Sequence, residues 1–585
     1  MNHLEVWAPY ADTVAARIKD RTHPLKASTG GWWHLSEPVA TNEDYAFIIN
    51  DGKPLPDPRS AQLPYGVHGP SRQVDHSAFT WHDGGWRAPP LSSAIIYELH
   101  VGTFSKEGTF DGVIRHLDYL CDLGITHVEL MPVNTFSGNR GWGYDGVGLY
   151  APQETYGGPD GLKRLVDTCH GKGLSVILDV VYNHLGPEGN YLNHFGPYFT
   201  DHYSSPWGEA VNLDGSGSFE VRRFFVENAL MWLRDYHIDG LRIDAVHTLV
   251  DMSAIHFLEE LAEAVKRLEA ETGRHLVVIA ESDLNNPRVV TPVAAGGYGM
   301  DAQWSDDFHH ALHALLTGEK AGYYSDFGKI EDLARALTRV FVYDGRYSSY
   351  RHRNHGRPVE GLPGTCFLGY IQTHDQVGNR AKGDRISQLV QPEKLKIGAA
   401  IVLFSPFVPM LFQGEEWGAA TPFCYFSGHE DKDLGEAVRK GRLGEFAGFG
   451  WDPAEIPDPQ ALETYTQSIL DWDERENEPH RSLLDWYRRL IALRKKSIDL
   501  KDGRMNRITV THDENNQWLV ISRGTLLLAC NLNDKKQMIP IPAKKQATSV
   551  LLSTNNVEIV KDAVILPPFT AAIMLMRQSE ESNDH

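Results

Sequence analysis

The chain has 585 residues, enough for several domains, because one domain usually takes about 100–200 residues and an α/β barrel about 250 or more. Hydrophobic residues make up 42% and charged residues 23%, the balance of a globular protein with a substantial core. The formal net charge of −21 would repel nucleic-acid phosphates and anionic lipids, so we expect no nucleic-acid and no membrane partner.

The cysteines and the N-terminus indicate a reducing compartment. The five cysteines are scattered and show no CxxC spacing, which argues against a disulfide framework and a zinc site. The N-terminus, MNHLEVWAPY, lacks the basic and apolar regions of a signal peptide, and no window approaches the roughly 18 apolar residues of a membrane span. We therefore expect a cytoplasmic protein with no metal and no cofactor.

Residues 1–90 alternate short strand-like runs with turn residues. LEVWAP, ARIKD and YAFIIN are the strand candidates. The stretch PLPDPRSAQLPYGVHGPS is rich in proline and glycine and is typical of an extended connector. This pattern predicts a small N-terminal β-sandwich.

Residues 91–505 alternate apolar runs of strand length with amphipathic helical patterns. Near-continuous apolar strands are typical of a parallel sheet covered on both faces, and eight of them predict an α/β fold, a closed (β/α)8 TIM barrel. The segment 181–220 is too long for an ordinary connection, and such loops often carry function. The eight runs are AIIYELHVG, THVELMPV, LSVILDVV, GLRIDAV, LVVIAES, MDAQWSD, FLGYIQT and PMLFQG.

Residues 506–585 return to strand patterning. RITVTH, QWLVIS, TLLLACNL, SVLLS and AVILPP are separated by turn residues, which predicts a C-terminal β-sandwich. The final QSEESNDH is polar, and we expect a disordered tail there.

Polar residues end several of the predicted barrel strands, where the active site of such a barrel lies. One acid at such a place has a plain structural explanation, a helix cap or an ion pair. Acids and imidazoles delivered to one rim by four strands are much harder to explain as structure. These residues are Asp179, Asn183 and His184 after the third strand, Arg242, Asp244 and His247 on the fourth, Glu281 after the fifth, and His374 and Asp375 after the seventh.

Two of these carboxyl groups have opposed environments. Arg242 and Asp244 are two residues apart on a strand, so both side chains point to the same side and the guanidinium keeps the carboxylate ionised. Glu281 ends an apolar strand, where desolvation raises the pKa and favours a general acid. Such a pair meets the requirement for glycoside hydrolysis, with retention if the two carboxyl groups lie roughly 5 Å apart.

Four segments resemble the four short regions shared by the α-amylase family: DVVYNH (179–184), GLRIDAVH (240–247), the strand ending in Glu281, and THD (373–375). The resemblance implies a catalytic barrel flanked by β domains, of which the N-terminal one binds glucan or only braces the barrel. It implies that Asp244 is the nucleophile and Glu281 the acid/base. It further implies that Asp375 holds sugar hydroxyls in the distorted ring. Supporting positions around the reacting sugar are matched by His184, Arg242 and His374.

Further segments resemble one subgroup of that family, which releases trehalose by hydrolysing the α-1,4 bond next to the terminal trehalose of maltooligosyltrehalose. They include residues 141–162, 186–201 and THDQVGNRAKGDR (373–385). Branching enzymes tend to have Asp-Glu-Val where this chain has Asp375-Gln-Val. The resemblance implies maltooligosyltrehalose as the substrate and metabolic coupling to the synthase that makes it. A branching enzyme or other transglycosylase remains an alternative. So does a non-catalytic glucan-binding protein, although the intact catalytic set speaks against it.

Aromatic and polar residues of the rim are candidates for further substrate contacts. Tyr144 resembles the residue that stacks under the reacting sugar, and Trp207 and Tyr350 are candidates for the trehalose side. Core packing is the alternative for each ring. His247 and Gln376 complete the predicted substrate-binding set.

Other patterns carry no functional prediction. Residues 141–146 satisfy GxGxxG, but the helix that a dinucleotide site requires does not follow. Asn183 matches a position that binds calcium in some family members, and a structural hydrogen bond is the alternative. We expect His309 and His310 to face the surface of a helix.

Overall fold

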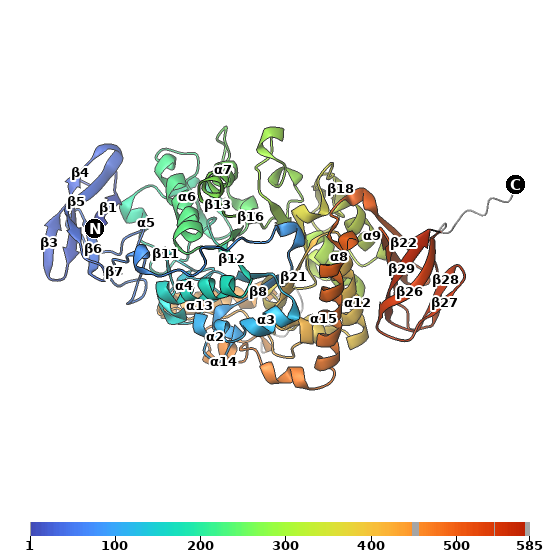
Figure 1. The fold of residues 1–585 in the computed structure, drawn as a ribbon. Coiled ribbons are helices and arrows are strands. Elements are labelled where there is room, and N and C mark those ends of the chain that lie inside the picture. The colour runs from blue at the N-terminus through green and yellow to red at the C-terminus, as the bar shows by residue number, and fades with distance from the viewer. Residues whose placement is uncertain (1, 447–454, 543–544, 579–585) are drawn as a thin grey trace.

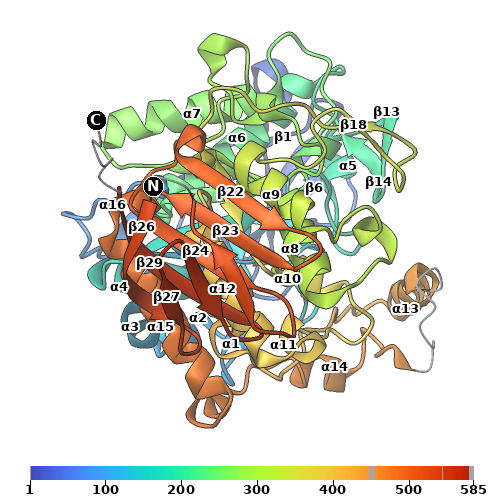
Figure 2. The same cartoon turned by 90° about the vertical axis from the view of Figure 1, so that its right-hand side faces the viewer.

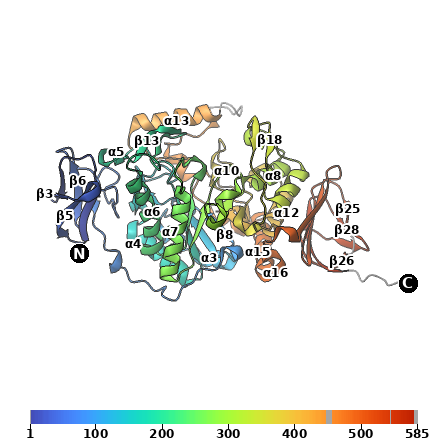
Figure 3. The ribbon, with the colours of Figure 1, turned by 90° about the horizontal axis from the view of Figure 1, so that it is seen from above.

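The computed structural model describes residues 2–446, 455–542 and 545–578. A closed barrel of eight parallel strands occupies the middle of the molecule, as Figure 1 shows. The N-terminal sheets and the C-terminal sheets lie at opposite ends, which is also clear from above in Figure 3. The predicted fold, a (β/α)8 barrel with β structure at both ends of the chain, is confirmed.

All eight predicted apolar runs form barrel strands, and every residue of these strands is buried. The strands can be apolar on both faces because helices cover the outside while side chains fill the inside. In chain order the strands are β8 (Ile96–Leu99), β9 (His127–Leu130), β12 (Ser175–Val180), β15 (Gly240–Ile243), β16 (Val277–Ala280), β17 (Ala302–Trp304), β20 (Phe367–Gly369) and β21 (Val408–Phe412).

The inside of the barrel changes from apolar to charged along the strands. Side chains alternate between the two faces, so the inward residues of neighbouring strands form layers. The layers nearer the strand starts are apolar and include Ile96, Ile177, Val277 and Val408. The layer nearer the strand ends pairs Glu98 with Glu129 and Asp179 with Arg242 in register. The active-site rim therefore rests on a buried charged layer.

Helices follow seven of the eight barrel strands within the described residues. Two short 3-10 helices, Pro287–Val289 and Val293–Ala295, follow β16 instead. Helix α7 buries Leu258, Leu261 and Val265 on the predicted face and ends at Gly273, whose φ is +65°. The main outer helices are α2 (Phe110–Ile114), α3 (Leu117–Leu123), α4 (Gly158–Gly171), α6 (Ser218–Asp235), α7 (Phe257–Thr272), α8 (Asp306–Thr317), α12 (Pro392–Phe404) and α15 (His480–Lys496).

The prediction that His309 and His310 face a helix surface is wrong. Both are buried in α8, because α9 (Ile330–Arg339) and a 3-10 helix at Gly322–Tyr324 cover the outer side of α8. The Nε2 atom of His309 lies 3.0 Å from the Tyr324 hydroxyl, so the buried imidazole has a polar partner.

Two hairpins project from the same face of the barrel, along the upper edge in Figure 1. The long segment after β12 contains α5 (Leu192–Phe195) and the first hairpin, β13 (Phe199–Ser205) and β14 (Gly208–Val211). The second hairpin, β18 (Arg346–Ser348) and β19 (Arg353–His355), follows α9. They carry Trp207 and Tyr350, two of the predicted substrate contacts, in their turns.

Two antiparallel sheets face each other at the N-terminal end and enclose buried Val6, Ala16, Leu35 and Phe47. The three predicted runs correspond to β1, β2 and β6, whereas the more polar strands were not predicted. A domain limit at residue 90 stays a prediction. The first sheet contains β1 (Asn2–Trp7), β5 (Trp32–Val39) and β4 (Lys26–Ala27), and the second β3 (Arg21–Pro24), β2 (Val14–Ile18), β6 (Asp44–Ile49) and β7 (Ser71–Arg72).

The C-terminal end is a five-stranded sheet with a three-stranded sheet beside it, which face the viewer in Figure 2. Every predicted run here corresponds to a strand. The first residue of the predicted polar tail, Gln578, still belongs to the last strand, and the rest of the tail lies outside the described residues. The larger sheet has the order β22 (Ile508–Asp513), β23 (Trp518–Arg523), β24 (Leu526–Asn531), β29 (Thr570–Gln578) and β26 (Lys545–Ser553), and the smaller β25 (Gln537–Pro540), β28 (Ala563–Leu566) and β27 (Glu558–Val560).

All five cysteines are free thiols. Within the part of the chain that the structure describes, no helix is both long enough and apolar enough to cross a bilayer.

Candidate active site

Arg242 is the hub of the rim at the strand ends. Its guanidinium is completely buried, and Nη1 donates to the Asp179 carboxylate at 2.7 Å and to Asp244 Oδ1 at 2.8 Å. Nη2 lies 3.7 Å from Glu281 Oε2. The centroid of the Trp304 ring lies 4.3 Å from the guanidinium carbon, a cation–π contact. One buried cation therefore contacts three acids from three strands.

Asp244 is held in its ionised form. Its second oxygen, Oδ2, accepts a hydrogen bond of 2.7 Å from the Asn183 amide. Burial alone would raise the pKa of Asp244, but the Arg242 guanidinium, His184 and the Asn183 amide outweigh burial and lower that pKa below its ordinary value. An ionised carboxylate with fixed orientation is what a nucleophile requires.

Glu281 has the opposite environment. Burial raises its pKa well above the ordinary value, and the neighbouring Asp244 charge adds to the rise, while Arg242 opposes it. The Ala245 backbone N–H donates to Glu281 Oε2 at 2.6 Å. Ala245 has a φ of +39°, a strained conformation for alanine, which aims this N–H at the carboxyl group. Glu281 can therefore be a neutral acid at a pH where Asp244 is charged.

A chain of hydrogen bonds joins the seventh strand end to Arg242. Nδ1 of His374 contacts the Glu98 carboxylate, and Nε2 lies 2.7 Å from the Tyr144 hydroxyl, which donates to Asp179 at 2.6 Å. Burial would lower the pKa of His374, but Asp375 and Glu98 raise it to about 9. A protonated imidazole can donate from both nitrogens, so every hydrogen bond of this chain has one donor and one acceptor.

Asp375 lies at the open side of this series of hydrogen bonds. Its side chain is 41% exposed, and Oδ1 lies 3.5 Å from His374 Nε2. Oδ1 also accepts from the Asn379 amide at 3.3 Å. A partly exposed carboxylate at the mouth of the site can accept further hydrogen bonds from substrate hydroxyls.

His184 and Trp207 form one wall of a cavity of about 360 Å3. Their rings are stacked, with centroids 4.2 Å apart and planes 9° from parallel. Trp207 is 49% exposed, so it is not a core residue, and its ring extends the surface of the site outward from His184. Asp145, Asn190 and Glu209 supply polar groups to the same cavity. Aromatic faces with scattered polar groups suit a sugar.

The remaining predicted contacts have other partners than the two carboxyl groups. His247 Nε2 lies 3.8 Å from Asp283, and Tyr350 is 45% exposed in the turn of its hairpin. Gln376 accepts a hydrogen bond from the Thr373 hydroxyl at 2.5 Å. Within the described residues, no hydrogen bond or ion pair joins these three to Asp244 or Glu281. Their placement fits an outer part of a substrate site rather than the reaction centre.

Several residues of the site were not predicted. Glu98 and Glu129 stand inside apolar runs, IYEL and HVEL, where a charge is unexpected in a strand buried on both faces. That contrast is the signal that could have found them. Burial raises the pKa of Glu129 well above its ordinary value, and its carboxyl oxygens have no hydrogen-bond partner within the described residues. Trp304 gave no signal, because a tryptophan in a strand usually marks core packing.

Known proteins resemble the chain over nearly its whole length. Residues 77–205 match the model of the alpha amylase catalytic domain. The malto-oligosyltrehalose trehalohydrolase of Arthrobacter ramosus is 52% identical over 84% of this chain and 86% of its own length. That of Rhizobium sp. (strain M-11) is 46% identical over 98% and 97%. This chain belongs to the malto-oligosyltrehalose trehalohydrolase family. The resemblance stated from residues 373–385 and the other segments is thereby confirmed.

A solved structure extends the likeness to three dimensions. The crystal structure of a Salmonella typhimurium protein described as an alpha amylase superposes with a TM-score of 0.91 at 38% identity, covering 98% of this chain and 97% of that one. The barrel and both sets of terminal sheets therefore occur together in that protein as well.

Proposed function

We propose that this protein is a retaining glycoside hydrolase that cleaves the α-1,4 bond next to the terminal trehalose of maltooligosyltrehalose and releases trehalose. The observation that carries the chemistry is the opposite pKa shift of two neighbouring carboxyl groups. The pKa of Asp244 is lowered and that of Glu281 is raised, while both carboxyl groups contact Arg242. The names of the family members that match most of the chain support the substrate.

The reaction follows from the two carboxyl groups. Glu281 gives its proton to the glycosidic oxygen as the bond to the leaving trehalose breaks, and Asp244 attacks the anomeric carbon to form a glycosyl-enzyme. Glu281, now ionised, then takes a proton from water, whose oxygen attacks the same carbon and frees Asp244. Both carboxyl groups touch one guanidinium, which supports a short separation and therefore retention.

The surrounding residues position the sugar that reacts. We assign Asp375 to hydroxyls of the distorted ring, Tyr144 to the face of that ring, and His184, Arg242 and His374 to support around it. Trp207, His247, Tyr350 and Gln376 are assigned to outer contacts, with Trp207 and Tyr350 on the trehalose side. The exposure of Trp207 and Tyr350 supports an outer role for these two rings.

Two alternatives use the same site differently. In a branching enzyme or other transglycosylase a sugar hydroxyl replaces water as the acceptor. A glucan-binding protein would perform no chemistry, and the opposed pKa values of Asp244 and Glu281 speak against it. The proposal also includes a cytoplasmic location and metabolic coupling to a synthase that makes maltooligosyltrehalose.

The decisive experiment compares two substrates of equal length, a plain maltooligosaccharide and a chain that ends in trehalose, with chromatography of the products. Free trehalose from the second and little cleavage of the first is the expected result. Rapid hydrolysis of the plain chain, or longer products formed by transfer, would contradict the assigned substrate. Glu281→Gln is the control, because it should lose about 10²–10⁴-fold in turnover and still bind the oligosaccharide.

A further inference from the structure

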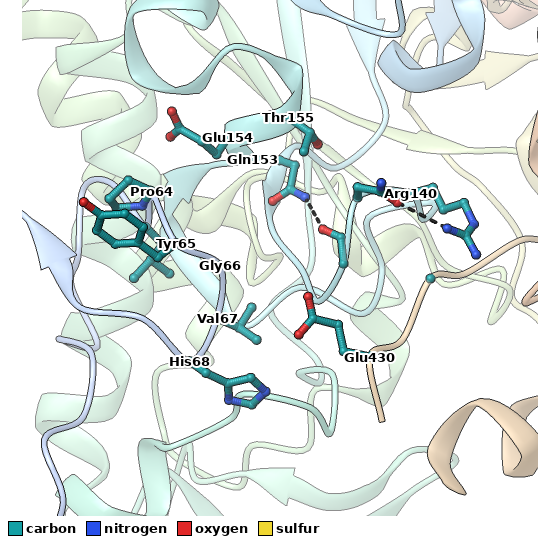
Figure 4. A pocket seen from close by; sticks show the side chains of 14 residues that line it. Pro64, Tyr65, Gly66, Val67, His68, Arg140, Gln153, Glu154, Thr155 and Glu430 are labelled. Carbon is teal, nitrogen blue, oxygen red and sulfur yellow. Dashed lines mark hydrogen bonds between the residues drawn. The ribbon is translucent and has the colours of Figure 1, made fainter. Parts of the chain in front are cut away.

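A second cavity, of about 460 Å3, lies between the segment that joins β6 to β7 and the barrel. Its size falls within the roughly 300–1,000 Å3 range of small-molecule sites. Three segments distant in sequence meet around it, at 63–68, 138–155 and 428–430. Figure 4 shows that the side chains of His68, Gln153 and Glu430 surround the opening.

This cavity is distinct from the one beside His184. The imidazole of His429 lies 3.4 Å from Glu188 and 3.9 Å from Asp145, which lines the His184 cavity. Glu188 in turn accepts the Glu430 backbone N–H at 3.2 Å and lies 3.7 Å from His68, and both of these residues line the second cavity. The buried pair His429 and Glu188 therefore forms a partition between the two hollows.

Several polar groups of the second cavity keep hydrogen-bonding capacity. The Gln153 amide donates to the Gly138 carbonyl at 3.0 Å, and its own oxygen has no partner within the described residues. Oε2 of Glu154 accepts a hydrogen bond from the Gln62 amide at 3.0 Å, which leaves Oε1 able to accept another. The Glu430 carboxylate has no hydrogen bond or ion pair within the described part of the chain, and Nε of Arg140 is buried without a partner.

The charges around the cavity select the class of ligand. Arg140, Glu154 and Glu430 line the cavity, and Glu188 accepts the Glu430 backbone N–H, so the surroundings are net negative and disfavour phosphates and other anions. Donors and acceptors occur together, and Leu63 and Val67 add apolar surface. A neutral sugar needs this combination, because its hydroxyls both donate and accept while its C–H faces are apolar.

We propose that this cavity is a second saccharide-binding site, separate from the reaction centre, that takes the end of a neutral gluco-oligosaccharide. That the sugar is an α-glucan rests on the proposed function, whereas the neutral saccharide class rests on the cavity itself.

The test counts bound ligands with maltotriose as the probe, by isothermal titration calorimetry in the Glu281→Gln background, where the probe stays intact. Thr155 lines the cavity, is exposed and makes no side-chain hydrogen bond within the described residues, so Thr155→Trp fills the space without removing a support. We expect this variant to bind one maltotriose fewer. In the otherwise native enzyme, Thr155→Trp should leave kcat and KM unchanged on the shortest trehalose-ended substrate. The matched control is Thr511→Trp, at an exposed threonine of β22.

A second variant covers the case in which Thr155→Trp does not fold. Glu430→Ala should weaken the second binding event about tenfold, the loss expected for one hydrogen bond to a charged group. Unchanged stoichiometry and affinity for maltotriose in a folded variant would overturn the proposal. A raised KM with the same number of bound maltotrioses would also overturn it, because the cavity would then belong to the catalytic cleft. If the protein binds two maltotrioses but releases no trehalose, the second site stands and the proposed function fails.

Discussion

Replacing Asn183 by alanine tests whether Asp244 is held ionised by its neighbours. The Asn183 amide donates to Asp244 Oδ2 at 2.7 Å and to the Asp244 carbonyl at 2.8 Å. A hydrogen bond to a charged group contributes about 1.5–3 kcal/mol. Because about 1.4 kcal/mol corresponds to a change of one in pKa, losing this bond should raise the pKa of Asp244 by about 1–2.

The sign of the effect on activity is fixed by the role of the carboxylate. The acidic limb of the pH profile of kcat/KM reports the pKa of the group that must be ionised in the free enzyme. The amide stabilises the ionised form, so Asn183→Ala moves this limb to higher pH, and activity is lost first in mildly acidic buffer. The measurement is kcat/KM on a trehalose-ended oligosaccharide from about pH 4 to 8.

Asn379→Ala is the matched control, because Asn379 donates at 3.3 Å to the exposed carboxylate of Asp375. It should leave the acidic limb in place. If Asn183→Ala lowers the rate equally at every pH and leaves the limb unmoved, the amide only positions Asp244, and the electrostatic account of the nucleophile is wrong.

Three further predictions concern binding, pH dependence and stability. Trp207→Ala removes a ring that stacks on His184, so KM should rise about two- to tenfold while kcat stays within about twofold, and an unchanged KM would exclude Trp207 from the substrate site. The pKa of His374 is raised to about 9, so its contribution to stability is complete below pH about 6.5 and is lost as the pH rises through about 9. Glu98→Gln should reduce the loss of stability between about pH 6.5 and 9, which a series of Tm measurements over this range would show. An identical pH dependence of Tm in the variant and the original protein would contradict the role given to the His374–Glu98 pair. Leu162→Ala, at a fully buried position of α4, should cost about 2–5 kcal/mol and lower Tm, whereas Leu462→Ala, at a residue that is 57% exposed, should not.

The barrel could be predicted from the sequence because its strands are buried on both faces. Runs such as LSVILDVV therefore stand out against the polar turns around them, and all eight correspond to strands. The N-terminal strands β3 and β5 could not be found in this way. β3 reads RTHP and β5 WWHLSEPV, with many exposed residues, so neither has the apolar pattern that marks a strand in the sequence.

Long-range contacts explain what the sequence could not reveal at the site. The strand-end carboxyl groups were visible because they follow apolar runs, but the partners of His374 and Tyr144 lie on β8 and β12, far away in sequence. The burial of His309 and His310 depends on α9 and the Gly322–Tyr324 turn, which cover α8 and cannot be inferred from the sequence of α8 alone. The exposure of Trp207 depends on the β13–β14 hairpin, whose register is set by the fold.

The configuration of the first product tests the central claim most directly. Proton NMR recorded within the first turnovers on a trehalose-ended oligosaccharide shows which anomer forms at the new reducing end before mutarotation. Attack by Asp244 followed by water activated through Glu281 inverts the carbon twice, so the α anomer should appear first. Initial formation of the β anomer would mean a single displacement by water, and Asp244 would then not be the nucleophile.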